Sequence, residues 1–192
     1  MREILIMDDK EANGYYEGDL DANGLPTGYG IFTWNDGDVY SGYYSAGKRH
    51  GMGRLTLADG TIYKGEWKND RPDGDFEILW PDDRAHFWGK MQNGKYHGFG
   101  TMNYSNGCAY SGQWVNGLCH GEGTFTQENG MLYRGEFRND RPCGRVCLTY
   151  QGTEYVGIFS DFMNATDVTA TYEDGSTRHG YIQNNTFYAD DT

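Results

Sequence analysis

The sequence predicts an all-β protein: an elongated, single-layer, twisted antiparallel β-meander of about seven hairpin repeats and about fifteen strands. Three observations predict it. A glycine recurs every 22 to 24 residues, large apolar residues alternate with polar ones around it, and Asp-Gly or Asn-Gly pairs follow at regular intervals. The anchor glycines are Gly18, Gly42, Gly65, Gly89, Gly112, Gly135, Gly157 and Gly180. A period this steady is typical of repeat architectures.

Each anchor glycine lies at the centre of an expected strand. In the third repeat, Tyr63 stands two residues before Gly65 and Trp67 two residues after it. Spacing by two places both large side chains on one face of a strand, and the glycine leaves room for a ring over the backbone. Because Lys64 and Glu66 between them are polar, the alternation has period two and indicates β-structure.

The segments between the anchors predict hairpin turns and a second strand in each repeat. A turn such as Asn93-Gly94 leads to a Gly-x-Gly pair such as Gly98-Phe99-Gly100, and a pair such as Asp59-Gly60 closes the unit. Asn-Gly and Asp-Gly are the strongest short hairpin signals, since both residues of the turn adopt positive φ. The chain therefore reads as consecutive hairpins.

These residues resemble a known family. The unit Tyr63-Lys64-Gly65-Glu66-Trp67, followed by a turn and by a segment such as His97-Gly98-Phe99-Gly100, resembles the MORN repeat over roughly residues 14 to 182. The resemblance implies an adaptor module or the accessory half of an enzyme. A closer likeness is to the N-terminal MORN half of a SET-type histone lysine methyltransferase, in Glu17-Gly18-Asp19-Leu20-Asp21, Gly24-Leu25-Pro26 and Trp80-Pro81-Asp82-Asp83-Arg84. The 192 residues hold no SET catalytic segment, so methyltransferase activity is not implied.

The repeat pattern predicts the domain boundaries. Residues 1–13 form a leader that can add an edge strand, residues 14–182 form the MORN-repeat domain, and residues 183–192 form a C-terminal tail. The seventh repeat is degenerate, because Phe162, Thr166 and Val168 stand where glycines belong. We expect it to cap the sheet, since a stack of repeats must end in a protected unit.

Composition narrows the partners. The net charge of −12 and the pI near 4.7 repel nucleic-acid phosphates and anionic lipid headgroups, so we expect no nucleic acid and no membrane, and a basic protein segment instead. Residues 4–7 are too short an apolar run for a signal peptide or a membrane span. We therefore expect a cytoplasmic protein with free cysteines, the nucleus being the alternative.

No pattern indicates catalysis, a cofactor or a metal. His50, His97 and His120 recur at one repeat position with Cys143 in a fourth repeat. Neighbouring repeats are two strands, about 9.5 Å, apart, whereas each ligand of a zinc ion lies about 2.0–2.3 Å from it. Equivalent positions in successive repeats are therefore too far apart to share one ion. Because nucleophile-elbow and phosphate-loop motifs are lacking too, we expect a protein that is not an enzyme.

We expect the function to be protein binding on an aromatic groove. A single layer leaves its apolar face partly exposed, and large exposed apolar patches mark binding sites. The groove would take an amphipathic helix or an extended segment with basic residues. Alternatives are a regulatory MORN domain of a methyltransferase-like enzyme and a membrane- or cytoskeleton-associated adaptor. Trp88 and Tyr43 interrupt the polar face, either as separate contacts or as packing for a terminal segment. The residues predicted to bind the partner are Trp67, Phe87, Met91, Tyr104, Tyr110, Trp114 and Tyr133.

Overall fold

The computed structural model describes residues 3–9, 12–81 and 85–190, with side chains described for 14–81 and 85–190. The described residues form 17 strands and no α-helix, so the all-β prediction is confirmed. Three segments named above lie partly outside the described residues. These are the leader at residues 1–2 and 10–11, the tail at residues 191–192, and the segment that carries the methyltransferase likeness at Asp82-Asp83-Arg84.

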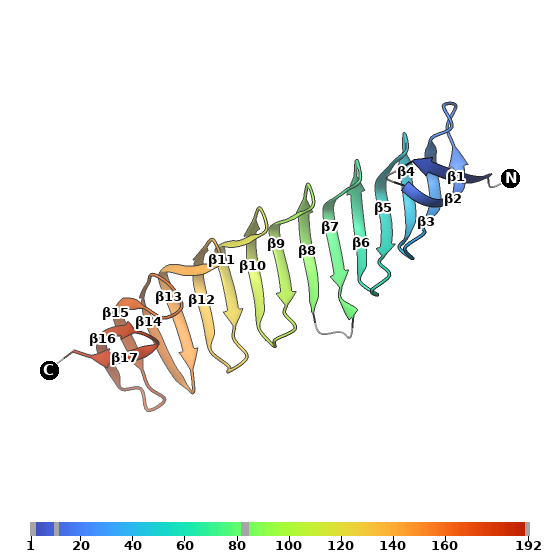
Figure 1. The fold of residues 1–192 in the computed structure, drawn as a ribbon. Coiled ribbons are helices and arrows are strands. Elements are labelled where there is room, and N and C mark those ends of the chain that lie inside the picture. The colour runs from blue at the N-terminus through green and yellow to red at the C-terminus, as the bar shows by residue number, and fades with distance from the viewer. Residues whose placement is uncertain (1–2, 10–11, 82–84, 191–192) are drawn as a thin grey trace. The chain divides into compact units, whose positions relative to one another are not determined.

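The chain consists of two compact units, Met1–Tyr96 and His97–Thr192. In the first unit each strand pairs antiparallel with the next along the chain. Figure 1 shows these strands in chain order from blue to green. They are β1 (Glu3–Asp9), β2 (Ala12–Leu20), β3 (Pro26–Trp34), β4 (Val39–Ser45), β5 (Lys48–Thr56), β6 (Ile62–Lys68), β7 (Arg71–Leu79) and β8 (His86–Gln92), and β9 (Lys95–Asn103) begins here.

The second unit repeats this meander. Each of its strands again pairs antiparallel with the next, from β9 to β17. They are β10 (Ala109–Val115), β11 (Leu118–Thr126), β12 (Leu132–Arg138), β13 (Arg141–Tyr150), β14 (Thr153–Phe159), β15 (Ala165–Thr171), β16 (Thr177–Gln183) and β17 (Thr186–Ala189). The predicted antiparallel meander is therefore present in both units.

Two strands lie outside the region where we expected repeats. β1 pairs with β2 from Glu3↔Gly18 to Asp9↔Ala12, so much of the leader is a strand. β17 lies within the expected tail and pairs with β16 through Tyr181↔Tyr188. These two strands account for the excess over the expected number. Neither segment carries an anchor glycine, so the repeat pattern did not include it.

The hairpin turns follow the chemistry that the sequence predicted. Asn93-Gly94 and Asn116-Gly117 have positive φ at both central residues, and Asn69-Asp70 has the same conformation without a glycine. Two consecutive left-handed residues are the geometry of a type I′ turn, whose twist matches that of the flanking strands. Asparagine and aspartate tolerate this conformation better than other L-residues, because their short side chains bond to the local backbone.

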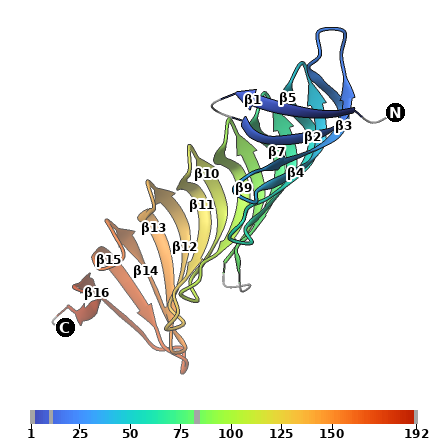
Figure 2. The ribbon, with the colours of Figure 1, turned by 45° about the vertical axis from the view of Figure 1, so that its right-hand side comes forward.

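A β-bulge follows the anchor glycine in several repeats. The register shifts between Gly42 and Tyr44 and between Gly65 and Trp67 in the first unit, and between Gly112 and Trp114 in the second. A bulge bends its strand and increases the local twist. The strands of the second unit are visibly bent along their length in Figure 2. The sheet is thus curved, and its two faces differ in how much they expose.

The core lies on one face of each unit, which we call the inner face. It carries the aromatic residue that precedes each anchor glycine and the large residue that follows it. Tyr16, Tyr40, Phe87, Tyr110 and Tyr133 are fully buried on this face. Alternation places the intervening residues on the opposite, outer face. The core is therefore a single row of interlocking rings, built from side chains that are spaced by two.

Candidate interaction surface

On the inner face a tyrosine ring covers a pair of glycines. A Cβ atom added at Gly42 or at Gly53 would clash with the hydroxyl end of Tyr40, so the ring lies directly on both backbones. The Tyr40 hydroxyl then donates a hydrogen bond to the carbonyl oxygen of Tyr43 at 3.2 Å. In the second unit Tyr110 donates to the carbonyl oxygen of Gln113 at 2.9 Å. In these two repeats the accepting carbonyl belongs to the residue after the anchor glycine, at the point where the register shifts.

In two repeats a tryptophan two residues after the anchor glycine adds a hydrogen bond to this arrangement. Trp67 Nε1 donates to the carbonyl oxygen of Gly53 at 3.2 Å, and Trp114 Nε1 donates to that of Gly100 at 3.1 Å. The ring of Trp67 meets the ring of Tyr40 edge to face at 5.4 Å, and the rings of Trp114 and Tyr110 do so at 5.0 Å. Such pairs add about 0.5–1.5 kcal/mol beyond their buried area. The aromatic-x-Gly-x-aromatic unit thus stabilises the fold through hydrogen bonds and ring contacts.

The repeats that lack the second glycine fill its place with a side chain. Phe76 and Val146 stand at this position and are almost completely buried. In the second unit, Tyr133 donates instead to the carbonyl oxygen of Phe162 at 3.1 Å, and the two rings meet edge to face at 5.1 Å. Burial raises the pKa of Tyr133 to about 12. Phe162 of the degenerate seventh repeat therefore covers the end of the ring row.

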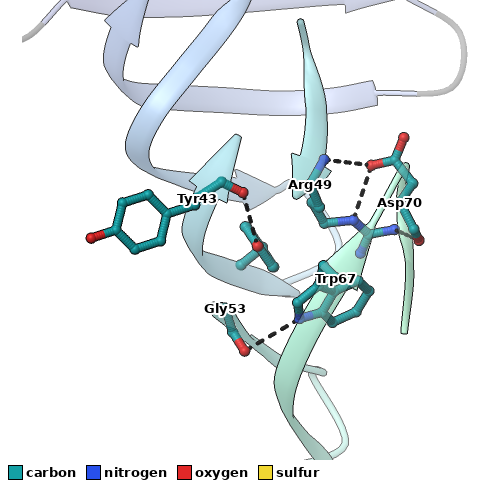
Figure 3. A network of polar contacts seen from close by, with 6 residues as sticks. Tyr43, Arg49, Gly53, Trp67 and Asp70 are labelled. Atoms are coloured by element: carbon teal, nitrogen blue, oxygen red, sulfur yellow. Dashed lines mark hydrogen bonds and ion pairs between the residues drawn. The ribbon is translucent and has the colours of Figure 1, made fainter. Parts of the chain in front are cut away.

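A polar network ties neighbouring turns together in the first unit (Figure 3). Asp70 Oδ1 accepts hydrogen bonds from the Arg49 backbone N at 2.9 Å and from Arg49 Nε at 3.2 Å, and Arg49 Nη2 donates to the Asp70 carbonyl oxygen at 3.0 Å. The guanidinium lies 4.5 Å from the ring centroid of Trp67. Because Arg49 is both hydrogen-bonded and stacked on a ring, it holds one hairpin to the next.

The second unit makes the same turn-to-turn link with different residues. The Cys119 backbone N donates to Asp140 Oδ1 at 2.8 Å, and the Asp140 backbone N donates to the Cys119 carbonyl oxygen at 3.1 Å. Burial, aided by the Asp140 carboxylate, raises the pKa of the Cys119 thiol to about 12. The thiol therefore stays protonated and packs as a small apolar group.

The expected partly exposed aromatic groove is wrong. Six of the seven residues predicted to bind the partner are at most 7% exposed, and Tyr104 alone is half-buried. The physical reason is that the rings lie flat on glycines and interlock edge to face, so a single layer buries them without a second layer. Contact of these residues with a partner stays a prediction. The buried residues are Trp67, Phe87 and Met91 in the first unit and Tyr110, Trp114 and Tyr133 in the second.

The large exposed side chains lie on the outer face instead. In the first unit the exposed fractions are 50% for Tyr29, 51% for Tyr43, 53% for Met52 and 68% for Trp88. Phe99 is 66% exposed in the second unit. Sequence reasoning noted Tyr43 and Trp88 but missed the other three. The signal was present, because Tyr29, Met52 and Phe99 are the middle residues of Gly-x-Gly pairs, and alternation places that position on the outer face.

The described residues offer little for metal chemistry. Within this part of the chain, no group of three or more His, Cys, Asp or Glu side chains is placed to hold a metal ion. His50 is exposed, while His97 and His120 are half-buried. Among the same residues, no helix has the length and apolar character needed to cross a membrane.

Comparison with known proteins identifies the family. The MORN repeat family matches six segments, at residues 16–39, 40–62, 63–74, 89–109, 110–132 and 133–152. The chain belongs to the MORN repeat family. The match ends before the seventh expected repeat, in which Val168 replaces a glycine. Its third segment ends just before Phe76, where a side chain likewise replaces the second glycine.

Similarity extends to a curated protein and to solved structures. The relative, described as "Inactive protein tyrosine kinase pTKL" of Plasmodium berghei, is 38% identical over 56 residues, which are 29% of this chain and 4% of that protein. This chain thus matches only a small part of it.

The solved structures show likeness of fold alone. The TCP domain of SAS-4 (dCPAP) from Drosophila melanogaster, in complex with a proline-rich motif of Ana2 (dSTIL), has a TM-score of 0.50 and 10% identity over 93% of this chain and 88% of that one. The TCP10 domain of Danio rerio CPAP, in complex with a STIL peptide, has a TM-score of 0.45 and 12% identity over 99% of this chain and 97% of that one.

Proposed function

We propose that this MORN-repeat protein is a non-enzymatic scaffold that binds a segment of a partner protein through exposed rings of its outer face. The observation that carries the proposal is the exposure of Tyr29, Tyr43, Met52 and Trp88 on the outer face, whereas most rings of the inner face are buried. Contiguous exposed apolar patches often mark interaction sites. Tyrosine and tryptophan are also the residue types most often found as binding hot spots.

The similar fold of the SAS-4 domain supports an extended ligand. That domain is in complex with a proline-rich motif of Ana2. Proline-rich segments dock on aromatic-lined surfaces at low entropic cost, because their backbone is already extended. We propose that this chain likewise takes an extended segment.

Charge defines the partner further. The net charge of −12 favours a segment that carries lysine or arginine, because opposite charges speed encounter and exclude acidic competitors. The cytoplasm, with the nucleus as the alternative, is the compartment we propose for this encounter.

Two other functions are kept as alternatives. The likeness of residues 17–26 to the MORN half of a SET-type methyltransferase would make this chain a regulatory domain, which co-purification with a methyltransferase activity would reveal. A membrane- or cytoskeleton-associated adaptor would sediment with anionic vesicles or filaments. The partner role predicted for the inner-face residues also belongs among the alternatives, and it requires the ring row to open.

Site-specific crosslinking tests the proposal. A photoreactive benzoylphenylalanine is placed at Tyr43 on the outer face, and in a matched variant at Asn116, which is exposed on a turn. We expect the Tyr43 variant to capture one partner segment repeatedly, as mapped by mass spectrometry of the crosslinked peptide. Equal and scattered crosslinking at both positions would contradict an outer-face site.

A further inference from the structure

We propose that the outer face of the first unit binds a proline-containing segment with one basic side chain. The prolines contact Tyr29 and Tyr43, and the lysine or arginine enters an adjoining pocket that contains Glu66 and Asp73. This inference rests on the proposed function and locates the ligand and its chemistry on one surface.

The aromatic part of this surface is a cross-strand pair. Tyr29 on β3 stands opposite Tyr43 on β4 in the register. Their ring centroids lie 5.6 Å apart and the ring planes make an angle of 81°, so the face of one ring meets the edge of the other. Both side chains are half exposed. Figure 3 shows the Tyr43 ring directed away from Trp67, that is, away from the packed inner face.

Met52 connects this pair to a pocket. Its side chain is exposed on β5, and the neighbouring Gly51 leaves the flank of Tyr43 open, because a Cβ atom at Gly51 would lie 3.4 Å from Tyr43 Cβ. A pocket of about 500 Å³ adjoins these residues and is lined by His50, Gly51, Met52, Glu66, Trp67, Lys68 and Asp73. Met52 and Gly51 thus belong to the wall of the pocket and adjoin the tyrosine pair, so the two form one continuous surface.

The charge of the pocket selects a cation. Its lining holds two carboxylates, Glu66 and Asp73, and one ammonium, Lys68. Asp73 Oδ2 accepts a hydrogen bond from the Asn93 backbone N at 3.1 Å, which fixes that carboxylate. An arginine or lysine that enters would bring the charges of the pocket into balance, because its charge is opposite to the net charge of the lining.

Nearby cations provide only part of this balance. Lys90 is held 2.9 Å from Asp75, and Lys64 lies 3.5 Å from Glu77. The charge of Glu66 also contributes to raising the pKa of Lys90, so Lys90 offsets part of the negative charge of the pocket. A ligand cation would meet the remainder.

The spacing fits an extended proline-containing chain. The distance from the tyrosine pair on β3 and β4 to the pocket on β5 and β6 is about two strand spacings, roughly 10 Å. A polyproline II chain advances about 3.1 Å per residue, so about three residues separate the proline at the tyrosines from the cation in the pocket. Proline rings suit the exposed tyrosines, because aromatic-lined surfaces recognise this pre-extended conformation.

Binding of labelled peptides to the full chain tests the inference. Short fluorescein-labelled peptides with a Pro-x-x-Pro-x-x-Arg core are titrated and followed by fluorescence anisotropy. We expect Tyr43→Ser to weaken binding at least about tenfold, as for a hot-spot tyrosine, and the double variant Glu66→Gln with Asp73→Asn to weaken only peptides that keep the arginine. The control is Tyr181→Ser in the other unit, where the tyrosine is 42% exposed against 51% for Tyr43; this variant should bind like the wild type.

Any of three results with the peptides would overturn the inference: wild-type protein that binds none of them, equal binding by Tyr43→Ser and Tyr181→Ser, or peptides that bind as well after every proline is changed to alanine. Self-association that Tyr43→Ser abolishes would show that a second copy occupies the surface, which also overturns it. Denaturation midpoints of all variants exclude unfolding as the cause. If crosslinking at Tyr43 captures a partner segment without prolines, the proposed function stands and only this inference falls.

Discussion

The clearest test of how the repeat folds is Gly123→Ala in the second unit. An added Cβ atom would lie 2.7 Å from Cε2 and from Cζ of Tyr110, closer than any stable carbon contact, so the ring must move. Tyr110 is fully buried, and its ring meets those of Trp114 at 5.0 Å and Phe137 at 5.3 Å.

The cost follows from what the displaced ring loses. Two aromatic pairs are worth about 0.5–1.5 kcal/mol each, and the hydrogen bond from the Tyr110 hydroxyl to the Gln113 carbonyl is worth about 1 kcal/mol. We therefore expect Gly123→Ala to reduce the free energy of unfolding by about 2–4 kcal/mol. Gly130→Ala is the matched control, because Gly130 has a φ of +85° and nothing within 4 Å. It should cost only the backbone strain of about 1–2 kcal/mol.

Urea denaturation followed by tryptophan fluorescence measures both effects, and a double-mutant cycle isolates the contact. Tyr110→Leu removes the ring that the new methyl group meets. In that background Gly123→Ala should cost at least about 1 kcal/mol less than in the wild type. Additive free-energy changes in the cycle would refute the claim that the glycine is required because a ring lies on it.

Three further outcomes follow from the same geometry. Gly121→Val should cost about 1–3 kcal/mol, because Gly121 has a φ of +65° that a branched residue adopts only with strain; an unchanged denaturation midpoint would contradict this. Trp114→Ala should lower the melting temperature by several degrees through lost packing, whereas Trp88→Ala should leave it nearly unchanged, and equal shifts would contradict the assignment of the two faces. Cys119, with its pKa raised to about 12, should resist alkylation at pH 8 in the native protein and react on denaturation; native alkylation as fast as that of the half-buried Cys108 would be inconsistent with its burial.

Much of the fold was predictable, because it depends on local chemistry that the sequence states directly. The pair Asn93-Gly94 predicts a turn with two left-handed residues, and both have positive φ. The alternation around Gly65 predicts a strand with Tyr63 and Trp67 on one face, and β6 places them so. These features require only the period of a strand and the conformational freedom of glycine and asparagine.

Burial was not predictable in the same way, because it depends on curvature and ring orientation. Sequence reasoning assumed that a single layer exposes one face of its rings. The structure shows bulges at Gly42 and Gly112 and rings that lie over glycines. A bulge is a shift in the pairing of two strands, and the residue pattern of a single strand does not show that pairing. The predicted binding residues were therefore chosen from the core.

The two faces of each strand have different roles: the inner face packs and stabilises the fold, and the outer face is the one proposed to bind a partner. Within Gly51-Met52-Gly53, the second glycine must stay bare because Tyr40 lies on it, and the first has a left-handed φ. Neither constraint applies to the middle residue, which lies on the outer face. Repeats can therefore carry Tyr29, Met52 or Glu122 at this position without disturbing the inner ring row. This position can therefore vary while the fold is kept, as can other outer-face positions such as those of Tyr43 and Trp88. Residues of the outer face can thus set the specificity for a partner repeat by repeat, and the exposed tyrosine pair of the first unit is one place where the chain departs from a polar surface.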